Sequence, residues 1–172
     1  IPIGSDMTPL LTGQVDTVTG WLTNTTALKP LGAERVDMRL WDTGVKLYAL
    51  PYYAHTDTIR SKPELLQRFL RATARGWAYA NKNRDAAVEL LIKEYPNLNG
   101  PDERVAVDSL MGFAYNDLTN KNGWGTMDKA VWQEQIDQYA ALGQFTKRTP
   151  KVDEVMTMDI LNATREYRLR NS

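Results

Sequence analysis

The sequence contains no cysteine and only one histidine, His55. Without cysteine the chain can form no disulfide, no thiolate metal site and no cysteine nucleophile, and the absence of thiols also fits an oxidising compartment. One histidine is too few for a two-histidine metal site or a histidine-based triad within this chain. We interpret His55 as a surface loop residue, and we expect no enzymatic activity, no metal and no cofactor.

The chain also lacks a net charge and a long apolar run. Lysine plus arginine (21 residues) balances aspartate plus glutamate (21 residues), which gives no electrostatic argument for binding nucleic acid or a membrane surface. No apolar stretch approaches the length of a membrane-spanning helix, so we expect no membrane insertion. No P-loop or G-x-G-x-x-G motif is present to hold a phosphate.

The first residues, Ile1-Pro2-Ile3-Gly4, have neither the basic start nor the continuous apolar stretch of a signal peptide, and there is no initiator methionine. We therefore expect this chain to begin inside a longer gene product. Because half of a binding cleft buries too little of a small ligand, we expect this segment alone not to bind one tightly.

The residues before position 60 have the composition of short strands. Val15–Thr19 is β-branched, Val36–Trp41 alternates apolar and charged residues, and Lys46–Ala54 is extended but interrupted by Pro51. Thr23 or Asn24 is placed to cap a short helix between the first two of these segments.

From residue 61 the apolar period becomes helical. Ser61 and Glu64 form a capping-box pattern, and apolar residues recur at steps of three and four as far as Ala80. Further helices are predicted from Asn83 to Tyr95, from Arg104 to Ala114, from Thr126 to Leu142 and from Met158 to Arg168, with a loop over Asn116–Gly125. Strands mixed with helices, followed by helices alone, predict an α/β fold.

Two tryptophans stand at the ends of predicted strands. Trp21 follows Thr19, with the cap residue Asn24 just behind it, and Trp41 is followed by Asp42. Ligands of open α/β sheets bind outside the carboxyl ends of strands. An indole face with a carboxylate suits a flat ring that carries an amine. These residues are our predicted ligand-binding set, and the alternative is that both tryptophans serve in core or interlobe packing.

The other tryptophans have a different setting. Trp77 and Trp132 lie on the apolar faces of predicted helices, which favours core packing. Trp124, in the predicted loop, is open to two interpretations: packing over a cleft or filling a gap between helices.

Several motifs follow one another in a familiar order: "LLTGQVDTVTG", the extended segment and helix pair from "DTGVKLYALPYY" to "AAVELL", then "GWGTMDKAVW" and "VDEVMT". Taken in this order they resemble the C-terminal half of the periplasmic solute-binding proteins of the family that includes the thiamine-pyrimidine, nitrate and alkanesulfonate binders. The resemblance covers essentially the whole chain.

This resemblance implies an α/β fold: the C-terminal half of a two-lobed type II periplasmic binding protein, with a short sheet portion followed by a mainly helical completion. It divides the chain into the second half of lobe two (1–45), an interlobe crossing segment (46–60) and the helical completion of lobe one (61–172). The implied partners are a small-molecule ligand, an ABC transporter permease and the missing N-terminal half of the same protein. The implied location is periplasmic, or lipid-anchored at the outer face of the inner membrane.

Within the family, the aromatic and acidic residues favour a thiamine pyrimidine precursor or a similar small heteroaromatic ligand. A nitrate or alkanesulfonate binder would need more basic character near Trp21 and Trp41. A pyrimidine-synthesising enzyme of the same fold and an autonomous helical interaction domain stay open as alternatives. A signal peptide or lipobox upstream would favour the binder, and a cysteine-rich motif with a histidine would favour the enzyme.

Overall fold

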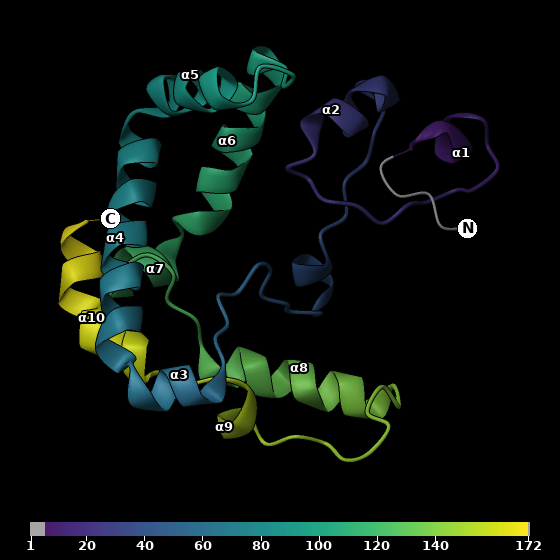
Figure 1. Cartoon of the computed structure of the whole chain (residues 1–172). Helices are drawn as coiled ribbons and strands as arrows, with labels where there is room; N and C mark the ends of the chain where they lie inside the picture. Colours follow the sequence, from purple (N-terminus) through teal and green to yellow (C-terminus); the bar gives the residue numbers. More distant parts are fainter. Residues whose placement is uncertain (1–5, 172) are drawn as a thin grey trace. The chain divides into compact units, whose positions relative to one another are not determined.

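The computed structural model of the chain describes residues 6–171, which fold into helices joined by irregular segments (Figure 1). Helices account for 61% of them. None of residues 6–171 lies in a β-strand. The prediction of an α/β fold with a short sheet portion is therefore wrong for the described chain.

The segments predicted as strands fail for a common reason. Val15–Thr19, Val36–Trp41 and Lys46–Ala54 have residues suited to strands, but a strand also needs a partner that takes its backbone N–H and C=O groups. Alternating apolar residues favour a strand only where one face is covered. Val36 is 91% exposed and Met38 76%, so no such face is covered here.

The described residues divide into two compact units, one formed by residues 6–37 and 79–114 and the other by residues 38–78 and 115–171. The first contains α1 (Thr8–Leu11), α2 (Thr25–Leu28), the 3-10 helix η1 (Lys29–Leu31), α5 (Arg84–Glu94) and α6 (Gly100–Ala114). The second contains the 3-10 helix η2 (Leu40–Thr43), α3 (Thr56–Ser61), α7 (Asp117–Asn122), α8 (Lys129–Ala141), α9 (Val152–Val155) and α10 (Asp159–Arg170), and α4 (Pro63–Lys82) contributes to both units. The division into 1–45, 46–60 and 61–172 stays a prediction.

The first unit is built on the contact of α5 with α6; Figure 1 shows α5 crossing the upper end of α6. Val88 of α5 and Met111 of α6 are buried. Helix α2 packs on α6 and buries Leu28. Removing these side chains from water is the main driving force for the association of the three helices.

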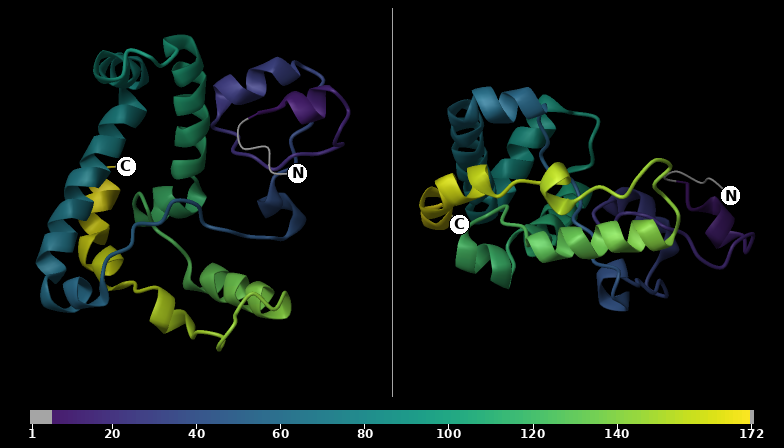
Figure 2. Two further views of the ribbon diagram at one scale, coloured as in Figure 1. Left: turned by 45° about the vertical axis from the view of Figure 1, so that its right-hand side comes forward. Right: turned by 90° about the horizontal axis from the view of Figure 1, so that it is seen from below.

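In the second unit, one face of α4 is buried. Leu70, Ala74 and Ala78 recur every four residues and are buried, which matches the helical period read from the sequence. Phe69 of the same helix is half exposed. Helix α7 packs on α10, and α8 packs on α9 (Figure 2).

The start of α4 differs from the prediction. Ser61 is the last residue of α3 rather than the cap of α4, which begins at Pro63. A separate short helix forms because the Nδ1 atom of His55 accepts a hydrogen bond from the backbone N–H of Asp57 at 3.2 Å, which caps α3. The His55 side chain is 77% exposed, which confirms its interpretation as a surface residue.

The predicted loop over Asn116–Gly125 also contains a helix, α7. Its first turn is held by a reciprocal capping box. The Asn116 side chain accepts hydrogen bonds from the backbone N–H groups of Leu118 (3.0 Å) and Thr119 (3.2 Å), and the Thr119 hydroxyl accepts one from the Asn116 N–H at 2.9 Å. Polar residues that looked like loop composition are here the cap that starts a helix.

A buried arginine of α10, Arg168, holds the segment that follows α7. Arg168 is only 1% exposed, and this burial lowers the pKa of its guanidinium below the ordinary value. It donates hydrogen bonds to the carbonyl oxygens of Gly123 (2.9 Å), Trp124 and Leu161 (2.8 Å) and to the hydroxyls of Thr126 (3.0 Å) and Thr164 (3.1 Å). A buried cation is tolerated when it is hydrogen-bonded in this way.

Gly123 allows this close approach. Its φ is +94°, and a Cβ atom built there would lie 2.8 Å from the Cβ of Arg168 and 3.0 Å from the backbone N of Leu169. Both the backbone conformation and the contact with α10 therefore require glycine.

We predict that Gly123→Ala destabilises the protein by about 2–4 kcal/mol, because backbone strain and overpacking both oppose the new methyl group. Gly125→Ala is the matched control: its φ is +77°, but nothing lies within 4 Å of its Cβ position. It should lose only about 1–2 kcal/mol. Urea unfolding measures both, and equal losses would contradict the contact with α10.

Candidate functional site

Part of the predicted ligand-binding set lies in the first unit. Thr19 and Trp21 belong to the irregular segment before α2, where Trp21 is 62% exposed. Asn24 lies at the position directly before α2, where a cap was predicted, but its side chain makes no capping hydrogen bond there. Its backbone N–H donates to the Trp21 carbonyl oxygen at 2.9 Å. The turn from Trp21 to Asn24 thus presents an exposed indole beside the start of a short helix.

This turn is held in place through α2. Asp102, near the start of α6, accepts a hydrogen bond from Lys29 Nζ at 2.9 Å and one from the Thr26 hydroxyl at 3.2 Å. The Thr25 hydroxyl donates to the Asp102 carbonyl oxygen at 2.9 Å. The Lys29 ammonium group, with the Thr26 hydroxyl, holds the pKa of the Asp102 carboxyl below its ordinary value. One carboxylate therefore fixes the helix that follows Trp21 and Asn24.

The other predicted residues, Trp41 and Asp42, lie in η2 of the second unit. Trp41 is 45% exposed. The Arg39 guanidinium donates from Nε to Asp42 Oδ2 at 2.7 Å and from Nη2 to Oδ1 at 3.0 Å, a bidentate pair. Each carboxylate oxygen keeps one further lone pair, so Asp42 can still accept a hydrogen bond from a ligand amine.

Arg39 is the site residue that the sequence reasoning missed. It brings a cation next to Asp42 and hence beside Trp41, where the sequence interpretation had counted only an acidic group. The signal was present in the spacing, because Arg39 and Asp42 are three residues apart at the start of a helical turn.

Trp41 belongs to a row of aromatic rings that runs onto α8. Its ring centroid lies 6.0 Å from that of Tyr48, which lies 6.2 Å from that of Trp132. The Tyr48 hydroxyl accepts a hydrogen bond from the backbone N–H of Asp128 at 2.7 Å, and burial raises the pKa of Tyr48. Trp41 therefore packs on Tyr48, which in turn packs on Trp132 of α8. The packing role predicted for Trp132 is confirmed.

A second aromatic group consists of Trp77 and Phe69 of α4 together with Tyr52 and Trp124. Trp77 stacks on Trp124 with centroids 5.3 Å apart and planes 30° apart. Tyr52 contacts Trp124 at 6.2 Å and Phe69 at 5.5 Å. Trp124 is only 5% exposed, so of its two interpretations the structure favours the filling of a gap between elements. The packing role of Trp77 is also confirmed.

The structure thus groups the predicted residues in two sets. Trp21 and Asn24 are joined in one turn of the first unit, and Trp41 and Asp42 are neighbours in the second, together with Arg39. A common ligand site for both sets stays a prediction.

Two further findings concern the described residues as a whole. Residues 6–171 contain no group of three or more histidine, aspartate or glutamate side chains arranged to hold a metal ion. Among the same residues, no helix combines the length and apolarity that crossing a membrane requires.

Comparison with protein families matches residues 1–87 to the family described as NMT1/THI5 like, which belongs to the periplasmic solute-binding proteins. The matched range contains every residue of the predicted ligand-binding set. No curated protein and no solved structure matches the chain.

We predict that Asp102 makes the stability of the protein acid-sensitive. Because its pKa is lower folded than unfolded, its contribution is fully present above the unfolded pKa, about 4, and is lost as the pH falls through the folded value. Asp102→Asn should therefore lower stability at neutral pH and flatten the loss below pH about 4. Urea unfolding across this range measures both.

The control is Asp16→Asn, an exposed aspartate of the same unit. If the two variants showed the same stability and the same acid dependence, the role given to Asp102 would be refuted.

Proposed function

We propose that this chain forms part of the solute-binding component of an ABC importer for a small heteroaromatic compound, foremost a thiamine pyrimidine precursor. The chain belongs to the NMT1/THI5-like family, and this membership supports the proposal. On this proposal the protein works without catalysis, in the periplasm or anchored by lipid at the outer face of the inner membrane. Its partners are the ligand, the permease and the N-terminal half that the resemblance implies.

The observation that carries the ligand class is the setting of Trp41. One side of this indole packs on Tyr48, and nearly half of its surface stays exposed. An indole that packs on a neighbouring ring and keeps much of its surface exposed to solvent is suited to stacking with a flat ligand ring. The exposed indole of Trp21, in a segment held by Asp102, offers a second such surface.

The charges beside Trp41 support an amine-bearing ring. Asp42 keeps acceptor capacity for an exocyclic amine, and Arg39 fixes the orientation of its carboxylate through two hydrogen bonds. The Asp42 side chain is half exposed in the described structure. Once a bound ring covers this carboxylate, a ring that carries an amine is favoured over one that does not, because an acceptor buried without a donor is unfavourable.

Arg39 also favours a second candidate, a binder of nitrate or an alkanesulfonate. A guanidinium presents parallel N–H groups that match the oxygens of a planar or tetrahedral anion. Its donors to Asp42 would have to be shared with such an anion, and for this reason the pyrimidine ranks first.

The test is calorimetry on the full-length protein with an aminopyrimidine, nitrate and methanesulfonate. We expect the aminopyrimidine to bind most tightly. Trp41→Ala and Trp21→Ala should each weaken it by about 2 kcal/mol, or roughly 30-fold, as for large aromatic residues at binding hot spots. Asp42→Asn should reduce the preference for the amine-bearing ring.

Trp77→Phe is the control, since Trp77 packs on Trp124 in the second aromatic group. It should change stability and leave affinity nearly unchanged. Unchanged affinity in the Trp21, Trp41 and Asp42 variants would remove the site. Tighter binding of nitrate or methanesulfonate, lost in Arg39→Gln, would replace the pyrimidine with the anion.

A further inference from the structure

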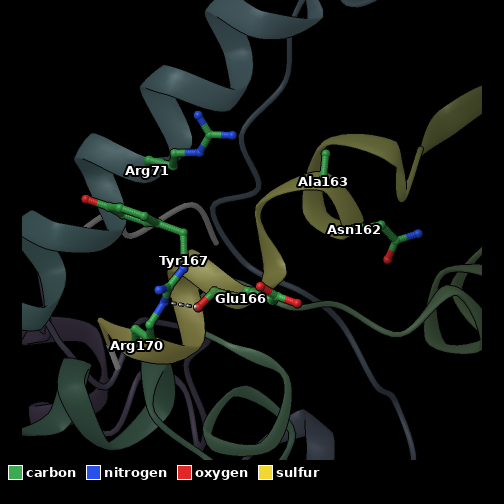
Figure 3. A pocket seen from close by; sticks show the side chains of 6 residues that line it. All are labelled: Arg71, Asn162, Ala163, Glu166, Tyr167 and Arg170. Atoms are coloured by element: carbon green, nitrogen blue, oxygen red, sulfur yellow. Dashed lines mark hydrogen bonds between the residues drawn. The ribbon is translucent and has the colours of Figure 1, made fainter.

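A polar hollow lies between α4 and α10 in the second unit. It has a volume of about 570 Å³, within the range of roughly 300–1,000 Å³ that is usual for small-molecule sites. Figure 3 shows Arg71 projecting from α4 and the other lining side chains coming from α10. The lining residues are Arg71, Asn162, Ala163, Glu166, Tyr167 and Arg170. The hollow shares no residue with the group around Trp41.

The two arginines of the hollow have most of their hydrogen-bonding capacity to spare. Arg71 donates from Nη2 to the Gln67 side-chain oxygen at 3.2 Å, and Arg170 donates from Nε to the Glu166 carbonyl oxygen at 3.4 Å (Figure 3). A guanidinium has five N–H donors, so each keeps an open fork. Both bonds are to neutral oxygens, so neither positive charge has a counter-ion among residues 6–171.

The described part of the chain pairs some of its arginines with carboxylates: Arg35, Arg39, Arg84, Arg104 and Arg148 each form an ion pair. Arg71 and Arg170 are among the arginines that form none within residues 6–171. The hollow is therefore lined by two guanidinium groups that pair with no carboxylate of the described residues.

Glu166 is the acidic residue of the lining, and its carboxylate pairs with neither arginine in the described structure. The lining thus carries two positive charges against one negative charge. The balance favours an anion with more than one negative charge, because such an anion gains more from two guanidinium groups than it loses to one carboxylate.

We propose that this hollow binds a phosphate group, either the free ion or a phosphate ester of a small molecule, between the guanidinium groups of Arg71 and Arg170. Guanidinium forks match the spacing of phosphate oxygens and bind them through paired, charge-assisted hydrogen bonds. The Tyr167 ring gives the hollow an apolar wall against which the organic part of an ester can pack. The site is independent of the function proposed above.

The test is a titration of the protein with inorganic phosphate and with phenyl phosphate at low ionic strength, followed by NMR of the arginine Nε–H groups. We expect saturable binding in the millimolar range or tighter, with shifts at Arg71 and Arg170. Arg71→Gln and Arg170→Gln should each weaken binding about fivefold or more, and Arg71→Lys should also weaken it because lysine lacks the fork. Tighter binding of phenyl phosphate would identify an ester, and equal binding would identify the free ion.

Two variants sharpen the test. Arg75→Gln removes a charge from the same helix outside the lining and should weaken binding less than Arg71→Gln does, because Arg75 contributes charge but no hydrogen-bonding fork to the hollow. Glu166→Gln removes the repelling carboxylate and should tighten binding severalfold. Absence of saturable binding, equal losses in Arg71→Gln and Arg75→Gln, or weaker binding in Glu166→Gln would each overturn the proposal.

Discussion

The guanidinium group of Arg168 joins α10 to the segment that follows α7 in the second unit. It lies inside the unit and bonds two successive carbonyl oxygens after α7, those of Gly123 and Trp124. Because a buried cation is stable only where acceptors surround it, these bonds fix the course of the backbone there. That course directs Trp124 onto Trp77 and Tyr52, and so joins α4 to the segment between α7 and α8.

Charged groups serve the same purpose elsewhere in the chain. In the first unit, Asp102 holds α2 and with it the turn that carries Trp21. In the second, Arg39 orients Asp42 beside Trp41, whose ring is supported by Tyr48. Large apolar side chains remain exposed next to these contacts, and polar interactions therefore position the residues on which a small heteroaromatic ligand would stack.

The helices could be predicted from the sequence, whereas the strands predicted from it do not form in the described residues. The period through Leu70, Ala74 and Ala78 is a local signal, and helical hydrogen bonds are local too. Helix α6 begins at Gly100 rather than Arg104, because Asn99 accepts a hydrogen bond from the N–H of Asp102 at 3.0 Å. Strands depend on partners distant in sequence, which composition does not reveal.

The role of Arg168 could not be predicted for the same reason. Its sequence position is that of an ordinary polar residue of a helix, and its acceptors are known only from the structure. Trp21, Asn24, Trp41 and Asp42 were predicted from their chemistry and from the ends of strands that do not form, so their role as a ligand site stays a prediction. The pairing of Arg39 with Asp42 required the structure.

The role of Arg168 is tested most directly by urea unfolding and near-ultraviolet circular dichroism of Arg168→Lys. Lysine keeps the charge but cannot reach several acceptors at once, so we predict a loss of about 3 kcal/mol and a weaker aromatic signal as Trp124 loses its fixed position. Arg165→Lys, on the exposed side of the same helix, should change neither. An Arg168→Lys protein with unchanged stability and an unchanged aromatic spectrum would contradict the account.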